Sequence, residues 1–180
     1  MTTPDDATCR TYLAAAIAEA RQGGAEGGIP IGAALVVDGT VLATGHNRRV
    51  QLGSAIRHGE TDCLENAGRL PASTYARSIM VTTLSPCDMC TGAILLYGIP
   101  TVIVGEHRTF MGGEDLLRAR GVEVIVVDDD ECVAMMSEFI AAEPTLWNED
   151  IGVCAPAIAR AGHVTSGHDR LDRNQAIISS

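Results

Sequence analysis

Short apolar runs alternate with segments of helical character along most of the chain. The apolar runs predict five strands, at 31–37, 40–45, 78–84, 101–105 and 122–127. Asp38-Gly39, between the first two runs, is typical of the turn of a β-hairpin. Helix-forming residues, with glycine or proline near the ends of several segments, predict helices over 8–22, 58–70, 87–97, 114–120 and 130–142.

After the hairpin, strands and helices alternate, and each strand is short and almost wholly apolar. Strands of this composition are covered by other elements on both faces. We therefore predict an α/β protein, a three-layer α/β/α sandwich around a five-stranded mixed sheet. The length of 180 residues suits one domain, predicted over 1–152, and the polar composition beyond Gly152 predicts a C-terminal extension over 153–180.

Composition and charge narrow the partners and the compartment. Hydrophobic residues make up 46% and charged residues 20%, which is typical of a compact protein. The net charge of −10 repels phosphate backbones, so nucleic acid is not expected as a partner. No apolar run approaches the ~20 residues of a membrane-spanning helix, and the acidic N-terminus lacks the features of a secretory signal. We expect no membrane partner and, with six cysteines, free thiols in the reducing cytoplasm.

The stretch SPCDMC, residues 85–90, places two cysteines three positions apart behind a strand. Ser85 is predicted to cap the following helix, with Pro86 at its first position, so Cys87 and Cys90 share one face of the first turn. The helix dipole favours thiolate there, which is the metal-binding form. By itself this pattern also allows a redox pair or two small core residues.

A second motif upstream favours the metal interpretation. His58 and Glu60 open the helix that follows the hairpin, and His-x-Glu followed by Pro-Cys-x-x-Cys is the signature of zinc-dependent deaminases. Three ligands leave zinc an open position for water, whereas a structural site takes a fourth. Cys63 is expected to point elsewhere around the helix, and His107 follows a different strand. We predict one catalytic Zn²⁺, held by His58, Cys87 and Cys90.

Glu60 is the predicted catalytic residue. Zinc lowers the pKa of bound water towards ~7 and so supplies hydroxide near neutral pH. A carboxylate beside that water can take its proton and pass it to a ring nitrogen of the substrate. The hydroxide attacks the ring carbon that bears the amino group, Glu60 later protonates the departing amine, and ammonia leaves.

Longer blocks of sequence extend these motifs, and the chain resembles the fungal cytosine deaminases, a group within the cytidine deaminase-like superfamily. The resemblance runs from about Ala14 to Gly152 and includes GGIPIGAAL, TGHNRR, HGETDCLENAGRL, TTLSPCDMCTGAILLYGIP and WNEDIG. It implies a zinc-dependent hydrolase of the pyrimidine salvage type that converts cytosine to uracil and ammonia. It also implies a homodimer.

The resemblance further implies how the base is bound. Asn47 is expected to hydrogen-bond the ring carbonyl, and Asp150 to contact the ring edge or the exocyclic amine. Backbone groups of Gly59 and Ser85 are expected to face the base. The segment around Trp147 is expected to close the pocket and exclude ribose. The apolar walls implied by the resemblance are Ile31, Leu84, Phe110 and Trp147.

Departures from the fungal pattern leave the substrate open to alternatives. Asn148 stands where that pattern has an aromatic residue, and the segment EHRTFMGGED differs on both sides of Phe110. Small changes near the ring can redirect substrate choice. The same chemistry on guanine, isoguanine or an aminated triazine is therefore one alternative. A tRNA or polynucleotide deaminase and a non-catalytic zinc or redox protein are the others.

Overall fold

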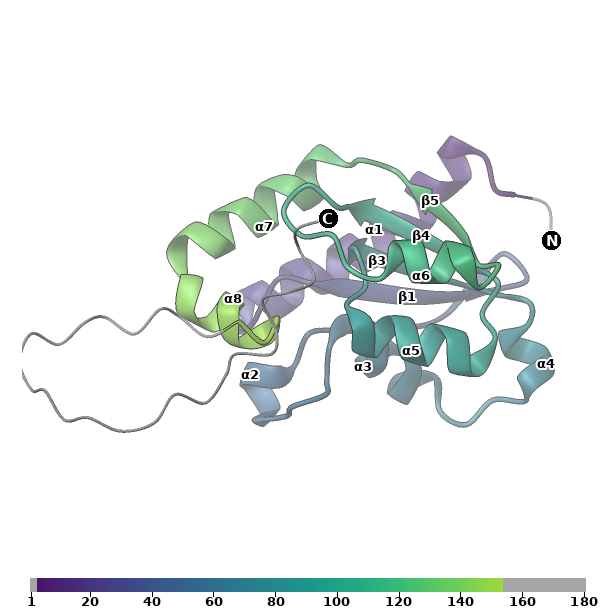
Figure 1. The fold of residues 1–180 in the computed structure, drawn as a ribbon, viewed down its shortest axis with the longest axis horizontal. Helices are drawn as coiled ribbons and strands as arrows, with labels where there is room; N and C mark the ends of the chain where they lie inside the picture. Colours follow the sequence, from purple (N-terminus) through teal and green to yellow (C-terminus); the bar gives the residue numbers. More distant parts are fainter. Residues whose placement is uncertain (1–2, 154–180) are drawn as a thin grey trace, which may run out of the picture.

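A five-stranded mixed sheet forms the centre of the protein, whose computed structural model describes residues 3–153 (Figure 1). β1 runs antiparallel to both β2 and β3, whereas β3, β4 and β5 are parallel, in the order β2-β1-β3-β4-β5. This confirms the predicted sheet. The strands are β1 Gly32–Val37, β2 Thr40–His46, β3 Ser78–Leu84, β4 Thr101–Glu106 and β5 Glu123–Val126.

Helices cover both faces of the sheet, as the apolar strands predicted. Leu13 of α1 and Cys132 of α7 pack with Ile103 on one face, and Leu64 of α3 and Ile94 of α5 pack with Met80 on the other. The α/β/α sandwich is therefore confirmed (Figure 1). The helices that form these two layers are α1 Asp6–Ala25, α7 Asp130–Ala142, α3 Gly59–Ala67, α5 Asp88–Tyr97 and α6 Glu114–Ala119.

The first helix is longer than the sequence predicted. It begins at Asp6, after Asp5 accepts a capping hydrogen bond from the Thr8 N–H at 2.9 Å, and it continues through Gly23-Gly24. Gly23 is buried against the ring of His46, where an added Cβ would lie 3.0 Å from a ring carbon. Packing against β2 thus outweighs the poor helix propensity of the glycines.

The other helix predictions need correction at their ends. The helix expected over 58–70 ends at Ala67, because Gly68 adopts φ +71° at its C-cap; a short α4, Ala72–Tyr75, follows Pro71. Ser85 is not the N-cap of α5: its N–H donates to the Glu106 carbonyl at 3.0 Å and extends the sheet, and Cys87 is the N-cap instead. The short helices α2 Arg49–Leu52 and α8 Pro144–Asp150 were not predicted.

α8 closes one end of the sheet. Its Trp147 is buried in a third apolar cluster with Ile31, just before β1, and Leu84, at the end of β3. Because β1 and β3 are antiparallel, these two residues meet at the same edge of the sheet. The predicted extension over 153–180 lies outside the described residues, apart from Val153.

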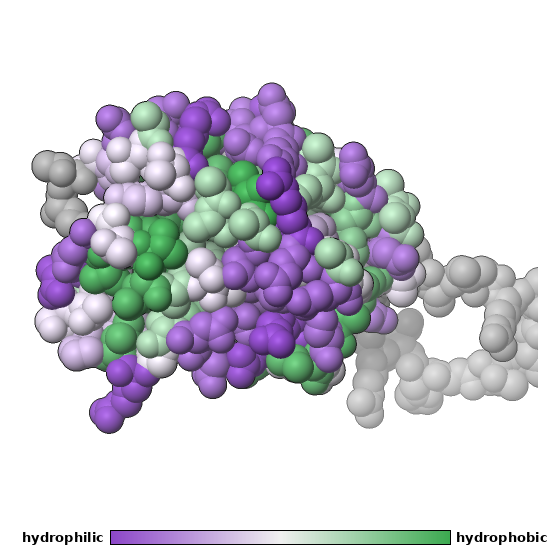
Figure 2. Space-filling model, turned by 180° about the vertical axis from the view of Figure 1, so that it is seen from behind, coloured by the Kyte–Doolittle hydropathy of each residue, from purple (hydrophilic) through white to green (hydrophobic). Residues whose placement is uncertain are grey.

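The surface carries both polar and apolar groups. Seen from behind, hydrophilic side chains cover much of the protein, and hydrophobic ones gather in separate patches (Figure 2). Among residues 3–153, no helix has the length and apolar character needed to cross a membrane.

Candidate active site

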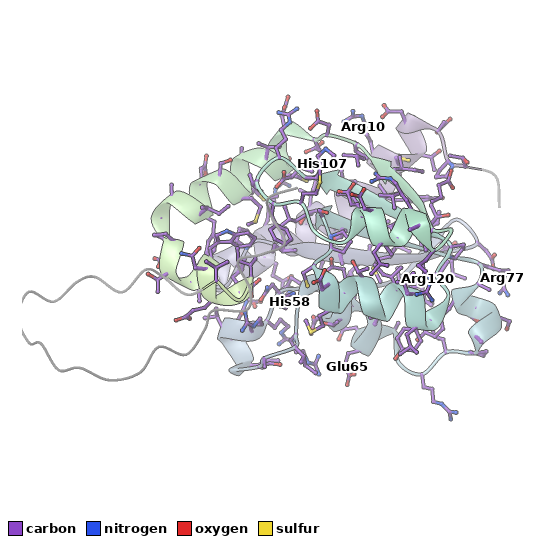
Figure 3. All side chains as sticks on the ribbon, in the orientation of Figure 1. Arg10, His58, Glu65, Arg77, His107 and Arg120 are labelled. Carbon is purple, nitrogen blue, oxygen red and sulfur yellow. The ribbon has the colours of Figure 1, made fainter. Side chains whose placement is uncertain are left out.

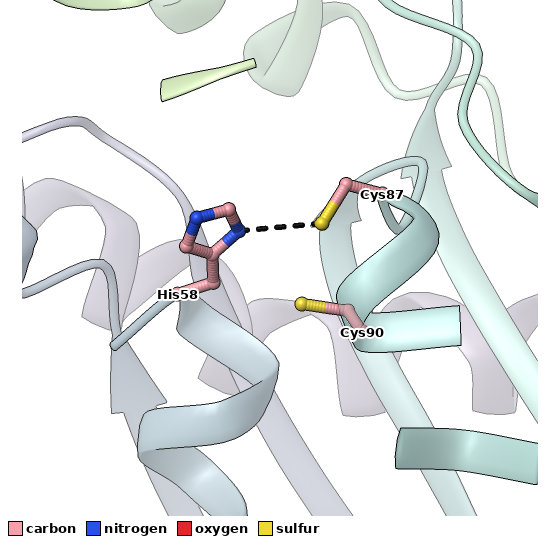
Figure 4. Close-up of side chains that lie close together, drawn as sticks. All are labelled: His58, Cys87 and Cys90. Carbon is pink, nitrogen blue, oxygen red and sulfur yellow. Dashed lines mark hydrogen bonds between the residues drawn. The ribbon is translucent and has the colours of Figure 1, made fainter. Parts of the chain in front are cut away.

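His58, Cys87 and Cys90 meet at the edge of the sheet where α3 and α5 begin (Figure 4). One ligand atom from each lies within 4.8 Å of the others, and Cys87 Sγ is 3.4 Å from His58 Nδ1. Tetrahedral zinc, with Zn–S near 2.3 Å and Zn–N near 2.0 Å, separates such atoms by about 3.5 Å. The donor set and its spacing therefore fit a zinc ion with an open position.

Local hydrogen bonds fix the backbone of these ligands. His58 is the N-cap of α3, and its N–H donates to Thr61 Oγ1 at 2.9 Å in a capping box. Cys87 is the N-cap of α5, and its carbonyl accepts from the Thr91 N–H at 2.8 Å. Both ligand-bearing helix starts are thus held rigidly before any metal binds.

The charges in the cluster favour metal binding. The hydrogen bond from Cys90 lowers the pKa of Cys87 to about 4 in the metal-free protein, with a further contribution from His58. The pKa of Cys90 is raised well above its ordinary value by its hydrogen bond to Cys87 and by burial. One thiolate is therefore present in the metal-free cluster, and the second thiol can lose its proton when a cation binds.

Glu60 is a buried carboxylate beside the cluster. It is 3% exposed, and burial raises its pKa, with the neighbouring charge of Cys87 as the next cause. Thr82 Oγ1, on β3, donates a hydrogen bond to Glu60 Oε1 at 3.2 Å. A carboxyl group with a raised pKa can both accept and return a proton near neutral pH.

A small, partly open cavity of about 20 Å³ adjoins Glu60 and the cluster. This is room for about one water molecule. Phe110 and Trp147 meet edge to face over it, with ring centroids 5.7 Å apart, and His58 lies below α8 (Figure 3). The lining residues are Ile31, His58, Glu60, Leu84, Ser85, Cys87, Phe110, Trp147, Asp150 and Ile151.

The remaining predicted site residues lie next to this lining. Asn47 is fully buried, and its Nδ2 donates to both Asp150 carboxylate oxygens, at 3.3 and 3.4 Å. Gly59 sits between His58 and Glu60 at the first position of α3, where the helix leaves its N–H free. Cys90 belongs to the metal cluster. The structure thus brings all the predicted residues to one place.

Neither of the alternative ligands joins the cluster. Cys63 Sγ lies 3.4 Å from the Ala43 carbonyl in the core, and His107 Nδ1 lies 3.1 Å from Glu114. Both positions agree with the expectation that the site has three protein ligands.

Sequence reasoning missed three residues near the site: Ile151, Arg49 and Thr82. Ile151 lines the cavity and follows Asp150 directly, so its place in the WNEDIG block was an available signal. Arg49 binds Asp150 from α2, a helix that the sequence did not predict. Thr82 faces Glu60 from β3, and its place at the start of the TTLSPCDMC block was an available signal.

Comparisons with known proteins agree with this geometry. Residues 7–106 match the family model of the cytidine and deoxycytidylate deaminase zinc-binding region. A cytosine deaminase of Candida albicans is 54% identical over 141 residues, covering 78% of this chain and 94% of that relative.

Two solved structures share the fold. A structure from a study of tRNA A34 deaminases is 26% identical, with a TM-score of 0.61, over 70% of this chain and 99% of that one. A guanine deaminase of Nitrosomonas europaea is 24% identical, with a TM-score of 0.59, over 78% and 87%, which shows the fold alone. The family match covers more than half of the chain and includes all three zinc ligands. The chain belongs to the cytidine and deoxycytidylate deaminase family and carries its zinc-binding region.

Proposed function

We propose that this protein hydrolyses a free nucleobase, cytosine, to uracil and ammonia. The observation that carries the proposal is that Glu60 and the predicted ligands His58 and Cys87 line the same small cavity. A buried proton carrier beside an open metal position is the arrangement that hydrolytic deamination requires. The cytosine deaminase of Candida albicans, 54% identical over most of its length, supports the choice of base.

Zinc held by His58, Cys87 and Cys90 would make a water molecule acidic near neutral pH and orient it for attack. The carboxylate of Glu60 takes the proton of that water and delivers it to the ring nitrogen next to the amino-bearing carbon. Once the water oxygen has bonded to that carbon, Glu60 takes the remaining hydroxyl proton and passes it to the amine, so that the C–N bond breaks, ammonia leaves and uracil remains. Burial of Glu60, with its raised pKa, suits both transfers.

The polar groups around the cavity suit a pyrimidine ring. Asn47 Nδ2 is a donor for the ring carbonyl, and the Asp150 carboxylate is an acceptor for the exocyclic amine or a ring N–H. The Ser85 N–H is already used by Glu106, so its carbonyl is the backbone group left for the base, whereas Gly59 offers its N–H. The rings of Phe110 and Trp147, which stand at 86° to each other, would give the flat ring apolar contacts on two adjacent sides.

At about 20 Å³ the cavity is smaller than any base, so its volume does not separate a pyrimidine from a purine. The choice of cytosine rests on the similarity to the Candida albicans enzyme. Asn148, the departure from the fungal pattern on α8, is not among the described residues that line the cavity.

The test is ammonia release by the zinc-loaded protein over a panel of bases. The panel holds cytosine, 5-methylcytosine, guanine, isoguanine, adenine, an aminated triazine and cytidine. Cytosine is expected to react fastest and cytidine not at all, because the walls leave no room for ribose. If a purine or a triazine reacts fast and cytosine reacts slowly, the choice of base is wrong, but the proposed deamination mechanism still holds.

The same panel, together with RNA binding and zinc removal, separates the other function classes. A polynucleotide deaminase would bind RNA with an affinity that falls as salt rises, which a net charge of −10 disfavours. A non-catalytic zinc or redox protein would release no ammonia from any base. Loss of all activity on chelation, with recovery on adding zinc, is expected for the proposed enzyme.

We also propose a homodimer formed through the face of α3 and α5. Leu96 is 79% exposed and Tyr97 43%, beside a hollow of about 720 Å³ that lies between α3, α4 and α5. Apolar side chains gathered at such a hollow are typical of a protein interface.

The five cysteines that the structure describes are free thiols, which supports the reducing cytoplasm as the compartment.

A further inference from the structure

Arg49 joins α2 to α8 through a partly buried ion pair. Its Nη1 lies 2.6 Å from Asp150 Oδ1, and the Asp150 side chain is only 2% exposed. The same nitrogen donates to the Glu149 carbonyl at 3.4 Å. A charge-assisted hydrogen bond that is largely withdrawn from water is stronger than an exposed one. One guanidinium group therefore ties the last turn of α8 to the edge of the site.

The backbone of Arg49 also orients Asn47. The Arg49 N–H donates to Asn47 Oδ1 at 3.1 Å, so the amide oxygen is occupied and Nδ2 is turned towards Asp150. Asn47 and Asp150 are the two side chains proposed to read the polar groups of the base. Both are thus held by Arg49, one through its backbone and the other through its side chain.

The cavity must widen for each turnover. Its volume of about 20 Å³ admits roughly one water molecule, so a pyrimidine ring enters only when a wall moves. The loop that carries Phe110 is tightly tied: Glu106 Oε2 accepts from the backbone N–H of Arg108 and of Thr109, at 2.6 and 3.0 Å. The Gly112 N–H on the same loop donates to Ser85 Oγ at 3.0 Å.

α8 is tied to other elements by hydrogen bonds from the side chains of Arg49 and Asn47, whereas the loop is tied through three of its own backbone N–H groups. Within residues 3–153, its hydrogen bonds to other elements start from Arg49 and Asn47 and end on Glu149 and Asp150. The rest of its attachment is apolar packing of Trp147 and its neighbours. α8 is therefore the wall that can move at the least cost, and Arg49 supplies its strongest single tie.

We propose that Arg49 is a positioning residue that latches α8 over the bound base and holds Asp150 in place to contact it. The proposal rests on the proposed deaminase function for the identity of the base. Arg49 is not among the residues that line the small cavity, although it borders the adjoining open hollow with Asp150. Its hydrogen bonds go to Asp150 and Asn47, and we assign its action to them.

The protein carries its own reporter of this latch. Trp147 is the only tryptophan in the sequence, it lies on α8, and it is 6% exposed. Its fluorescence and its quenching by acrylamide therefore measure how firmly α8 is closed. Neither measurement needs a substrate.

The test compares Arg49→Gln with Arg49→Lys and with the control Arg57→Gln. Arg57 Nη1 is paired at 2.8 Å with Asp62, which is 1% exposed, so the control also removes the partner of a buried carboxylate. Arg49→Gln is expected to increase quenching of Trp147 and to raise KM on the order of tenfold, with a smaller change in kcat. Arg49→Lys should recover part of both effects, and Arg57→Gln should leave the quenching unchanged.

Unchanged quenching and unchanged KM in Arg49→Gln would overturn the proposal, as would a fall in kcat alone. Far-ultraviolet circular dichroism and zinc content show whether each variant is folded. If Arg49→Gln does not fold, the comparison is made with Arg49→Lys instead. The fluorescence result is independent of activity. The two proposals can therefore fail separately. The enzyme could be active without the latch, or the latch could work in a protein that deaminates no base, and the two measurements tell these cases apart.

Discussion

Thr82 Oγ1 on β3 lies 3.2 Å from Glu60 Oε1 on α3, and both side chains are buried. The same hydroxyl lies 3.1 Å from the Leu84 carbonyl, so its one proton is shared between the two acceptors. When it is donated to Glu60, it orients the carboxylate and offsets part of the cost of burying a negative charge. The proposed proton carrier is thus supported by a strand residue that lies outside the His-x-Glu and Pro-Cys-x-x-Cys motifs.

Glu60→Gln is expected to retain zinc and base binding and to lower kcat by about 100- to 10,000-fold, because the amide cannot carry a proton. Ammonia release measures the rate, and metal analysis measures the zinc content. The control is Glu65→Gln on the same helix, where the Glu65 side chain is 68% exposed and lies outside the cavity. Near wild-type turnover in Glu60→Gln would show that Glu60 is not the proton carrier.

Thr82→Val is expected to lower kcat by about tenfold, because it keeps the shape of the side chain and removes a hydrogen bond to a buried carboxylate. KM should change little, since Thr82 is not among the described residues that line the cavity. Steady-state kinetics on cytosine checks both parameters. A rise in KM without a fall in kcat would show that Thr82 shapes the pocket instead.

Removal of zinc is expected to expose Cys87 to alkylation at neutral pH, whereas Cys90, which is buried and has a raised pKa, should react more slowly. In the loaded protein the metal should protect Cys87. Cys63 is a control within the same chain, because burial raises its pKa to about 12 and its sulfur faces the Ala43 carbonyl. Peptide mapping by mass spectrometry before and after chelation measures the three sites. Equal protection of Cys87 with and without metal would contradict the assigned ligand set.

Leu96→Glu is expected to dissociate the proposed dimer, because it places a charge among apolar side chains that a partner would cover. Leu96 is 79% exposed, so a monomer should tolerate the change without loss of stability. Light scattering coupled to gel filtration measures the mass in solution. Leu116→Glu on α6, where Leu116 is 48% exposed, is the matched control.

Much of the fold was predictable because its signals are local. The apolar strands, the Asp38-Gly39 turn and the helix before Gly98 follow from neighbouring residues, and the structure has all three. The metal ligands were predictable because zinc chemistry requires fixed residue types at fixed spacings.

The errors arose where distant residues decide the local structure. α1 continues through Gly23 because His46 packs against it, and Ser85 leaves the helix because its N–H bonds to Glu106 on β4. The tie between Arg49 and Asp150 spans 101 positions and has no local signature. The residues predicted to contact the substrate came from the resemblance, because no local motif around them indicates that role.

The two halves of the site come from different parts of the chain. The three predicted metal ligands lie between residues 58 and 90, whereas Asn47 and Asp150, which bond to each other, are 103 positions apart. The proposed metal site therefore draws its side chains from the middle of the chain alone. Enclosing a base requires, in addition, that the last described helix docks on that centre.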